Sequence, residues 1–162
     1  MLPAFGKRRS GRRPVTQLPT AGLLISKRRA ALLDLQLADR LSYDNERNML
    51  FANFEGMSVR SIADVESVRR VFDALCRRIG RKVAVVVNYD GFRLDDSVGD
   101  AYFEMISDLE ARYYSTAVRY TTSAFMRMKL GSELSARQSA AHVFESRDEA
   151  LAFATNHEQV VP

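Results

Sequence analysis

Short polar residues follow two predicted strands of this chain, at the points where those strands end. Asn88 lies near the end of the valine-rich segment 82–89, and Asp90 follows that segment directly. Thr122 and Ser123 come directly after the next predicted strand. In open α/β sheets, ligands bind beyond the carboxyl ends of the strands, where helix N-termini present free N–H groups to anions. These four residues are therefore predicted to form a binding edge for a small anion. Helix capping alone also explains the same residue types, and it is the simpler interpretation.

Two further groups of residues could be interpreted as a metal site or a catalytic site. The loop after residue 89 is rich in carboxylates, whose oxygens suit Mg²⁺ or Ca²⁺. These carboxylates are Asp90, Asp95, Asp96 and Asp100. Their spacing is not that of an EF-hand loop, and a solvated loop leading into a helix explains them better. Ser123 and His142 suggest a nucleophile with its base, but no G-x-S-x-G elbow surrounds Ser123 and His142 begins a predicted strand, so we assign no catalytic residue. We also assign no metal ligand and no cofactor.

The segment that follows Ser123 is predicted to be a helix with apolar residues on nearly all sides. Phe125, Met126 and Met128 lie within its first two turns. Flexible methionine side chains suit adaptable contact surfaces. We therefore predict that this helix packs against another chain or domain, and we name these three residues as the candidate protein interface.

Composition places the chain among ordinary globular domains. It has 162 residues, 46% of them hydrophobic and 27% charged, and a single cysteine. This is enough apolar material for one core, and one cysteine cannot form an internal disulfide. No run approaches the roughly 20 apolar residues of a membrane helix, so we predict no membrane partner and a cytoplasmic location.

The first 30 residues differ from the rest of the chain. They hold eight of the 24 basic groups and no acid, so the remainder carries 16 basic and 20 acidic groups. The basic charge therefore gives little support for nucleic-acid binding by the domain itself. We expect residues 1–30 to be a disordered basic tail and residues 31–162 to be a single domain. An import signal, a nucleic-acid or lipid arm, and a start inside a longer gene stay open as alternatives for the tail.

Hydrophobic periodicity predicts the order of the elements. Two short apolar segments joined by a polar loop at 44–48 predict a hairpin. Apolar residues at spacings of three and four predict a helix over 61–79, ended by Gly80. The run KVAVVVNY at 82–89 predicts a central strand covered on both faces. Capping-box pairs are expected at two helix starts, Ser61 with Asp64 and Ser146 with Glu149.

Alternation of strands and helices after this hairpin indicates right-handed crossovers. We therefore predict an α/β fold with a mainly parallel sheet of four or five strands, helices on both faces and an antiparallel hairpin at the start. Residues 83–87 should lie in the middle of the sheet.

Three segments also resemble a known protein family. They are NYDGF at 88–92, RYTTSAFMRMKLG at 119–131 and HVFES at 142–146. The chain, from about Leu32 to Ala154, resembles the C-terminal extension of bacterial acyl-CoA:acetate/3-ketoacid CoA-transferases. In that family the catalytic glutamate and a glycine-rich CoA-binding stretch lie in the preceding domain. This chain has neither, so the resemblance implies a non-catalytic accessory module or fragment, with a transferase catalytic domain or a second copy as its partner.

A second resemblance concerns architecture. The order of elements is similar to that of STAS domains, in particular the SpoIIAA-like branch, where a final strand leads into an S-x-x-E-A-L-style helix. The sequence matches that pattern at Ser146, Glu149, Ala150 and Leu151. This favours an alternative function, a free-standing STAS-like regulatory domain that binds a protein partner or small anion. The D-S-S-G-like phosphorylation sequence of that family is replaced here by residues 88–91, NYDG. A small hydrolase or lyase using Asp90 is a third possibility.

Overall fold

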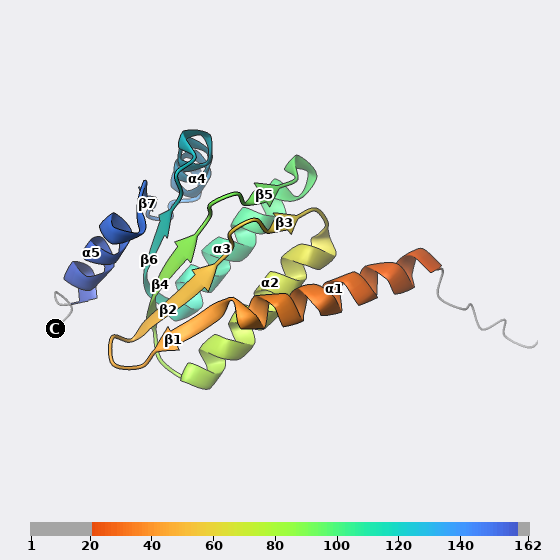
Figure 1. Ribbon diagram of the computed structural model, residues 1–162, viewed down its shortest axis with the longest axis horizontal. Coiled ribbons are helices and arrows are strands. Elements are labelled where there is room, and N and C mark those ends of the chain that lie inside the picture. Colours follow the sequence, from red (N-terminus) through yellow and green to blue (C-terminus); the bar gives the residue numbers. More distant parts are fainter. Residues whose placement is uncertain (1–20, 159–162) are drawn as a thin grey trace, which may run out of the picture.

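A five-stranded sheet organises the molecule (Figure 1). The computed structural model describes residues 21–158, and its sheet has the order β1-β2-β4-β6-β7. β1 pairs antiparallel with β2, and the other neighbours are parallel. The predicted α/β fold, the mainly parallel sheet and the initial hairpin are therefore confirmed. The strands are β1 (Leu41–Asp44), β2 (Met49–Asn53), β4 (Val83–Asn88), β6 (Tyr114–Tyr120) and β7 (His142–Phe144).

The valine run occupies the middle of the sheet, as predicted. β4 lies third in the order of five strands, between β2 and β6. Val83, Val85 and Val87 belong to one hydrophobic cluster, and Ala84 and Val86 belong to a second one. Because alternate side chains point to opposite faces of the sheet, a strand that is covered on both faces must be apolar throughout.

Helices cover both faces of the sheet unequally (Figure 1). α2 (Ile62–Ile79) and α3 (Gly99–Tyr113) pack on one face, and α1 (Ala21–Asp39) packs on α2. The opposite face is covered by α5 (Arg147–Glu158), which contacts β4, β6 and β7. α4 (Ala124–Ala136) lies at the end of the sheet toward which the parallel strands run.

Three short elements were not predicted. β3 (Ser58–Val59) and β5 (Arg93–Leu94) form a separate parallel pair, and the 3₁₀ turn η1 (Asp96–Val98) follows them. Two-residue strands are too short to produce a detectable period. They connect the ends of β2 and β4 to the helices α2 and α3.

The predicted helix boundaries are confirmed at α2. Ser61 and Asp64 form the capping box of α2, and Gly80 ends the helix with φ at 74°. The second capping box, at the start of α5, joins Ser146 and Glu149 through reciprocal bonds. Cys76 is buried on α2, and burial together with the charge of Asp73 raises the pKa of its thiol to about 11. Such a thiol is inert at neutral pH.

The predicted boundary of the tail requires a correction. The sequence places residues 21–30 outside the domain, whereas the structure has them as the first half of α1. Two contacts tie this half to α2: Arg29 Nη2 donates to Asp64 Oδ2 at 3.0 Å, and Ser67 Oγ donates to the Ala30 carbonyl at 3.3 Å. The run of Ala, Leu, Lys and Arg also has high helix propensity. The rest of the predicted tail, residues 1–20, lies outside the described residues.

None of the helices within residues 21–158 combines the length and the apolar character that a membrane-spanning helix requires.

Candidate functional site

Three of the four predicted ligand residues meet at the carboxyl ends of the parallel strands. Asp90 lies in the loop after β4, and its Oδ1 accepts bonds from the backbone N–H of Thr122 at 2.7 Å and from its hydroxyl at 3.0 Å. Asn88 Oδ1 in turn accepts from the Asp90 N–H at 2.9 Å. The loop after β4 is thereby fastened to the loop after β6. We call the surface formed by these loops and α4 the strand-end edge.

This network continues to β2. Asn88 Nδ2 donates to Asn53 Oδ1 at 3.1 Å, and the same oxygen accepts from the Glu55 N–H at 3.1 Å. The amide and carboxylate groups therefore satisfy one another. Their common effect is to hold three strand ends in fixed positions.

The electrostatics of Asp90 favour its ionised form. Its bond from the Thr122 N–H lowers the pKa of the carboxyl group below the ordinary 3.8, and this outweighs partial burial, which acts in the opposite direction. A general acid at neutral pH requires a raised pKa instead. Asp90 is thus suited to bridging loops or to binding a hydrogen-bond donor, and poorly suited to proton transfer.

Ser123, the fourth predicted ligand residue, has a different role. Its Oγ accepts from the Met126 N–H at 3.2 Å, which caps the start of α4. His142, considered with it as a catalytic pair, instead packs on the Phe153 ring with the centroids 4.4 Å apart. The simpler interpretation of Ser123, helix capping, describes its geometry.

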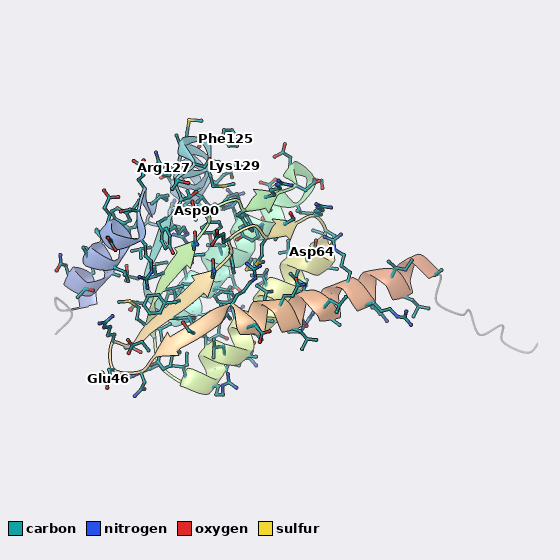
Figure 2. All side chains as sticks on the ribbon, in the orientation of Figure 1. Glu46, Asp64, Asp90, Phe125, Arg127 and Lys129 are labelled. Atoms are coloured by element: carbon teal, nitrogen blue, oxygen red, sulfur yellow. The ribbon has the colours of Figure 1, made fainter. Side chains whose placement is uncertain are left out.

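The predicted protein interface on α4 divides into two faces. Phe125 and Met128 are exposed, at 65% and 68% of their surface, and Phe125 is visible at the outer side of α4 in Figure 2. Met126 is half-buried and packs against the main core, so it offers less surface to a partner than Phe125 and Met128 do. It is four residues from the fully buried Leu130, and residues spaced by four share one side of a helix.

α4 is tied firmly to the body of the domain. Arg127 Nη1 donates to the Thr121 carbonyl at 2.8 Å, and Nη2 lies 3.8 Å from the Glu145 carboxylate. Lys129 Nζ forms an ion pair with Asp96 at 2.9 Å. The cations of α4 that Figure 2 labels are therefore already engaged. Phe125 and Met128 consequently project from a helix whose position is fixed.

The acidic loop does not form a metal centre. Asp95 Oδ1 accepts from both the N–H and the hydroxyl of Ser97, and Asp100 pairs with Arg137 at 2.8 Å. With Asp96 bound to Lys129, each carboxylate has its own partner. Within residues 21–158, no three His, Cys, Asp or Glu side chains gather in a way that could hold a metal ion.

The three segments that carry the family resemblance lie side by side. Residues 88–92, 119–131 and 142–146 contain the ends of β4, β6 and β7, which are neighbours in the sheet. The Tyr89 N–H donates to the Tyr120 carbonyl at 2.9 Å, and the Thr121 N–H donates to the Phe144 carbonyl at 3.1 Å. Together they build most of the strand-end edge.

A buried ion pair beneath this edge was missed from the sequence. Arg119, on β6, is 2% exposed and donates to Glu110 of α3. Desolvation is the largest single influence and favours the neutral guanidinium, but the charge and hydrogen bond of Glu110, with the nearby Tyr89 and Tyr102, together outweigh it, so the pKa of Arg119 lies above its ordinary value. Close by, the hydroxyls of Tyr89 and Tyr102 are 2.9 Å apart in the core. An arginine at an inward position of a predicted strand was the signal that could have revealed this pair.

A groove beside α5 was also missed. It has a volume of about 510 Å³ and is lined by residues of β1, β2, β4 and β6. Its charged residues are Arg40, Asp44, Arg47 and Arg147. The Arg147 guanidinium lies 5.8 Å from the centre of the Phe51 ring. No local pattern shows that α5 covers only part of this face, so the sequence carried no signal for the groove.

Comparisons of the chain with protein-family models, with curated proteins and with solved structures gave no significant match.

Proposed function

We propose that the chain is a non-catalytic accessory module of an acyl-CoA:carboxylate CoA-transferase-like protein. The observation that carries this proposal is the assembly of the strand-end edge from the three segments of the resemblance. These segments are separated along the chain by other elements, yet they share one surface. A family pattern confined to the core would be distributed over both faces of the sheet instead. Such a module would act in the cytoplasm.

The proposed role of the strand-end edge is to pack against the catalytic domain of the transferase. Phe125 and Met128 form its apolar part, and both are more than half exposed. Large apolar side chains at the centre of a contact commonly supply most of its binding energy. Because the bonds of Arg127 and Lys129 hold α4 in place, little conformational entropy would be lost on docking.

The test is binding of the purified chain to the catalytic domain of a CoA-transferase from the same organism, measured by calorimetry. The variant Phe125→Asp/Met128→Asp should weaken binding by about 30-fold or more, because two charges would enter an apolar contact. Ile62→Asp is the matched control, since Ile62 is similarly exposed, at 54%, and belongs to α2 rather than to the loops and helix of this edge. Equal binding by all three proteins would contradict the proposal.

The non-catalytic part of the proposal has a separate test. The purified chain, assayed alone with acyl-CoA and a carboxylate acceptor, should give no CoA transfer. Glu55 lies beside the network, where its N–H bonds to Asn53. Turnover that disappears with Glu55→Ala would identify a catalytic carboxylate and overturn this part.

The groove beside α5 favours a second candidate function, a STAS-like domain that binds a small anion. Three arginines and one aspartate line it, which gives the groove a positive balance. Calorimetric titration with inorganic phosphate distinguishes the two functions. Binding that is lost with Arg147→Gln and kept with Phe125→Asp/Met128→Asp would favour the anion site. Absence of phosphate binding would leave the accessory module as the better account.

A further inference from the structure

The helix α1 is apolar on two opposite sides. On the inner side, Leu33 and the fully buried Leu37 pack against the core. On the outer side, Ile25, Leu32 and Leu35 are 67%, 61% and 67% exposed. A surface helix ordinarily carries one apolar stripe and a polar opposite face. The packing of α1 against the rest of residues 21–158 therefore leaves the outer stripe unexplained.

The outer stripe has the spacing of a heptad. From Ile25 the outward positions recur after three, four, three and four residues, as they do at the a and d positions of a coiled coil. The five positions are Ile25, Arg28, Leu32, Leu35 and Asp39. Arg28 and Asp39 are exposed, and the side chain of neither forms a hydrogen bond or ion pair with any other residue of the part of the chain that the structure describes.

We propose that α1 pairs antiparallel with α1 of a second copy of the chain. In an antiparallel pair, an a position faces a d position of the other helix. Leu32 then faces Leu35 of the second copy, and Arg28 faces Asp39 of the second copy. The twofold symmetry of the pair repeats both contacts. The result is a centre of four leucines with an ion pair on each side.

Charge selects this arrangement over the alternatives. A parallel pair would place Arg28 against Arg28 and Asp39 against Asp39, which is repulsive at both ends. An antiparallel pair shifted by one heptad would place Arg28 against Leu32, where its charge has no partner. Unpaired charges at a contact are costly, and like charges select against wrong registers. Only the proposed register satisfies both charged positions.

The size of the contact predicts a weak dimer. α1 has 19 residues, about 28 Å of helix, and residues 28–39 overlap in this register. A contact of this length is at the small end of specific interfaces, for which micromolar dissociation constants are typical. This inference is independent of the function proposed for the strand-end edge, because it involves a different surface.

Sedimentation equilibrium of the full chain, from about 1 to 500 μM, tests the inference. The unmodified chain should pass from monomer to dimer over this range. Leu32→Glu/Leu35→Glu should raise the dissociation constant about 30-fold or more. Phe125→Glu/Met128→Glu is the matched control, with two apolar residues of similar exposure on α4, and should dimerise normally. A chain that stays monomeric at 500 μM, or a dimer that the α1 variant does not weaken, would overturn the proposal.

A charge exchange tests the register. Arg28→Asp and Asp39→Arg should each weaken the dimer about tenfold, because each creates a like-charge pair at both ends. The double variant R28D/D39R restores opposite charges and should recover dimerisation to within about threefold. Failure of the double variant to recover would overturn this antiparallel register. Circular dichroism should show unchanged helix content in all variants, since every altered side chain is exposed.

Discussion

Neighbouring residues at the ends of β4 and β6 face two different environments. Tyr89 and Arg119 point inward and are each 2% exposed, whereas Asp90 and Thr122 lie at the surface. The inward pair belongs to the core under α2 and α3. The outward pair joins two loops of the strand-end edge. One short stretch of sequence therefore contributes to both the packing of the core and the proposed contact surface.

The two environments stabilise charge in different ways. Arg119 lies where the dielectric constant is low, so it needs the opposite charge of Glu110 close by. Asp90 is partly solvated, and hydrogen bonds from Thr122 suffice to hold it. The comparison teaches that residues 88–92 and 119–131 contribute both to the packing of the core and to the surface. Substitutions should separate them.

Removing the charge of Glu110 should have the largest effect. Glu110→Gln leaves the Arg119 guanidinium buried without a countercharge, so we expect a loss of about 3–5 kcal/mol in the free energy of unfolding. Urea denaturation measures this loss. The variant Glu110→Leu/Arg119→Met removes both charges and should be less destabilised than Glu110→Gln. If the double variant is at least as unstable as Glu110→Gln, the ion pair is not the source of the effect.

The tyrosine pair of the core should give an intermediate effect. Tyr102→Phe removes the hydroxyl that lies 2.9 Å from the buried Tyr89 hydroxyl, for an expected loss of about 1–2 kcal/mol in the free energy of unfolding. The same denaturation experiment applies. Tyr89→Phe/Tyr102→Phe removes both hydroxyls and should cost less than the sum of the single variants. Strict additivity would mean that the two hydroxyls act independently.

Asp90→Asn should have a smaller effect that depends on pH. The folded pKa of Asp90 lies below its ordinary 3.8, so its stabilisation is present above 3.8 and is lost as the pH falls through the folded value. We expect the variant to lose about 1 kcal/mol at pH 7, a modest value because the group is partly solvated. The loss should shrink as the pH falls below about 4, because the unfolded carboxyl then binds a proton while the folded one does so only at a lower pH.

Thermal unfolding at pH 7 and pH 3 measures this difference. Glu104→Gln provides the control, because Glu104 is exposed on α3 and has no ion pair among residues 21–158. A loss for Asp90→Asn that is equal at both pH values would show that charge is not involved.

The outer residues of α4 should have the smallest effect on stability. Phe125→Asp/Met128→Asp changes two exposed side chains, so the free energy of unfolding should change by only about 0.5 kcal/mol. Urea denaturation of this variant and of Tyr102→Phe under the same conditions compares their losses in the free energy of unfolding. A loss as large as that of Tyr102→Phe would mean that these residues support the fold rather than a contact.

Local patterns were sufficient to predict most of the fold. The valine run of β4 could not be left exposed on either face, and the capping pair Ser61 and Asp64 marked the start of α2. Interactions between distant residues were not predictable in this way. Glu110 and Arg119 meet only because α3 packs across β6.

The candidate site was predicted in part for the same reason. Strand ends that are parallel and adjacent bring Asn88, Asp90 and Thr122 together, so the order of elements was enough. The side to which Met126 turns depends on how α4 packs against β7 and α3. The sequence of α4 alone is apolar nearly all round and could not distinguish its inner from its outer face.

Hydrogen–deuterium exchange of the full chain, with and without the CoA-transferase catalytic domain, tests the central claim most directly. We expect added protection at the strand-end edge, in peptides covering residues 88–92 and 121–129. Peptides covering residues 73–80, at the end of α2 that leads into the start of β4, should exchange unchanged. Protection that is absent from both edge peptides, at concentrations of catalytic domain well above those of the chain, would contradict the proposed contact surface.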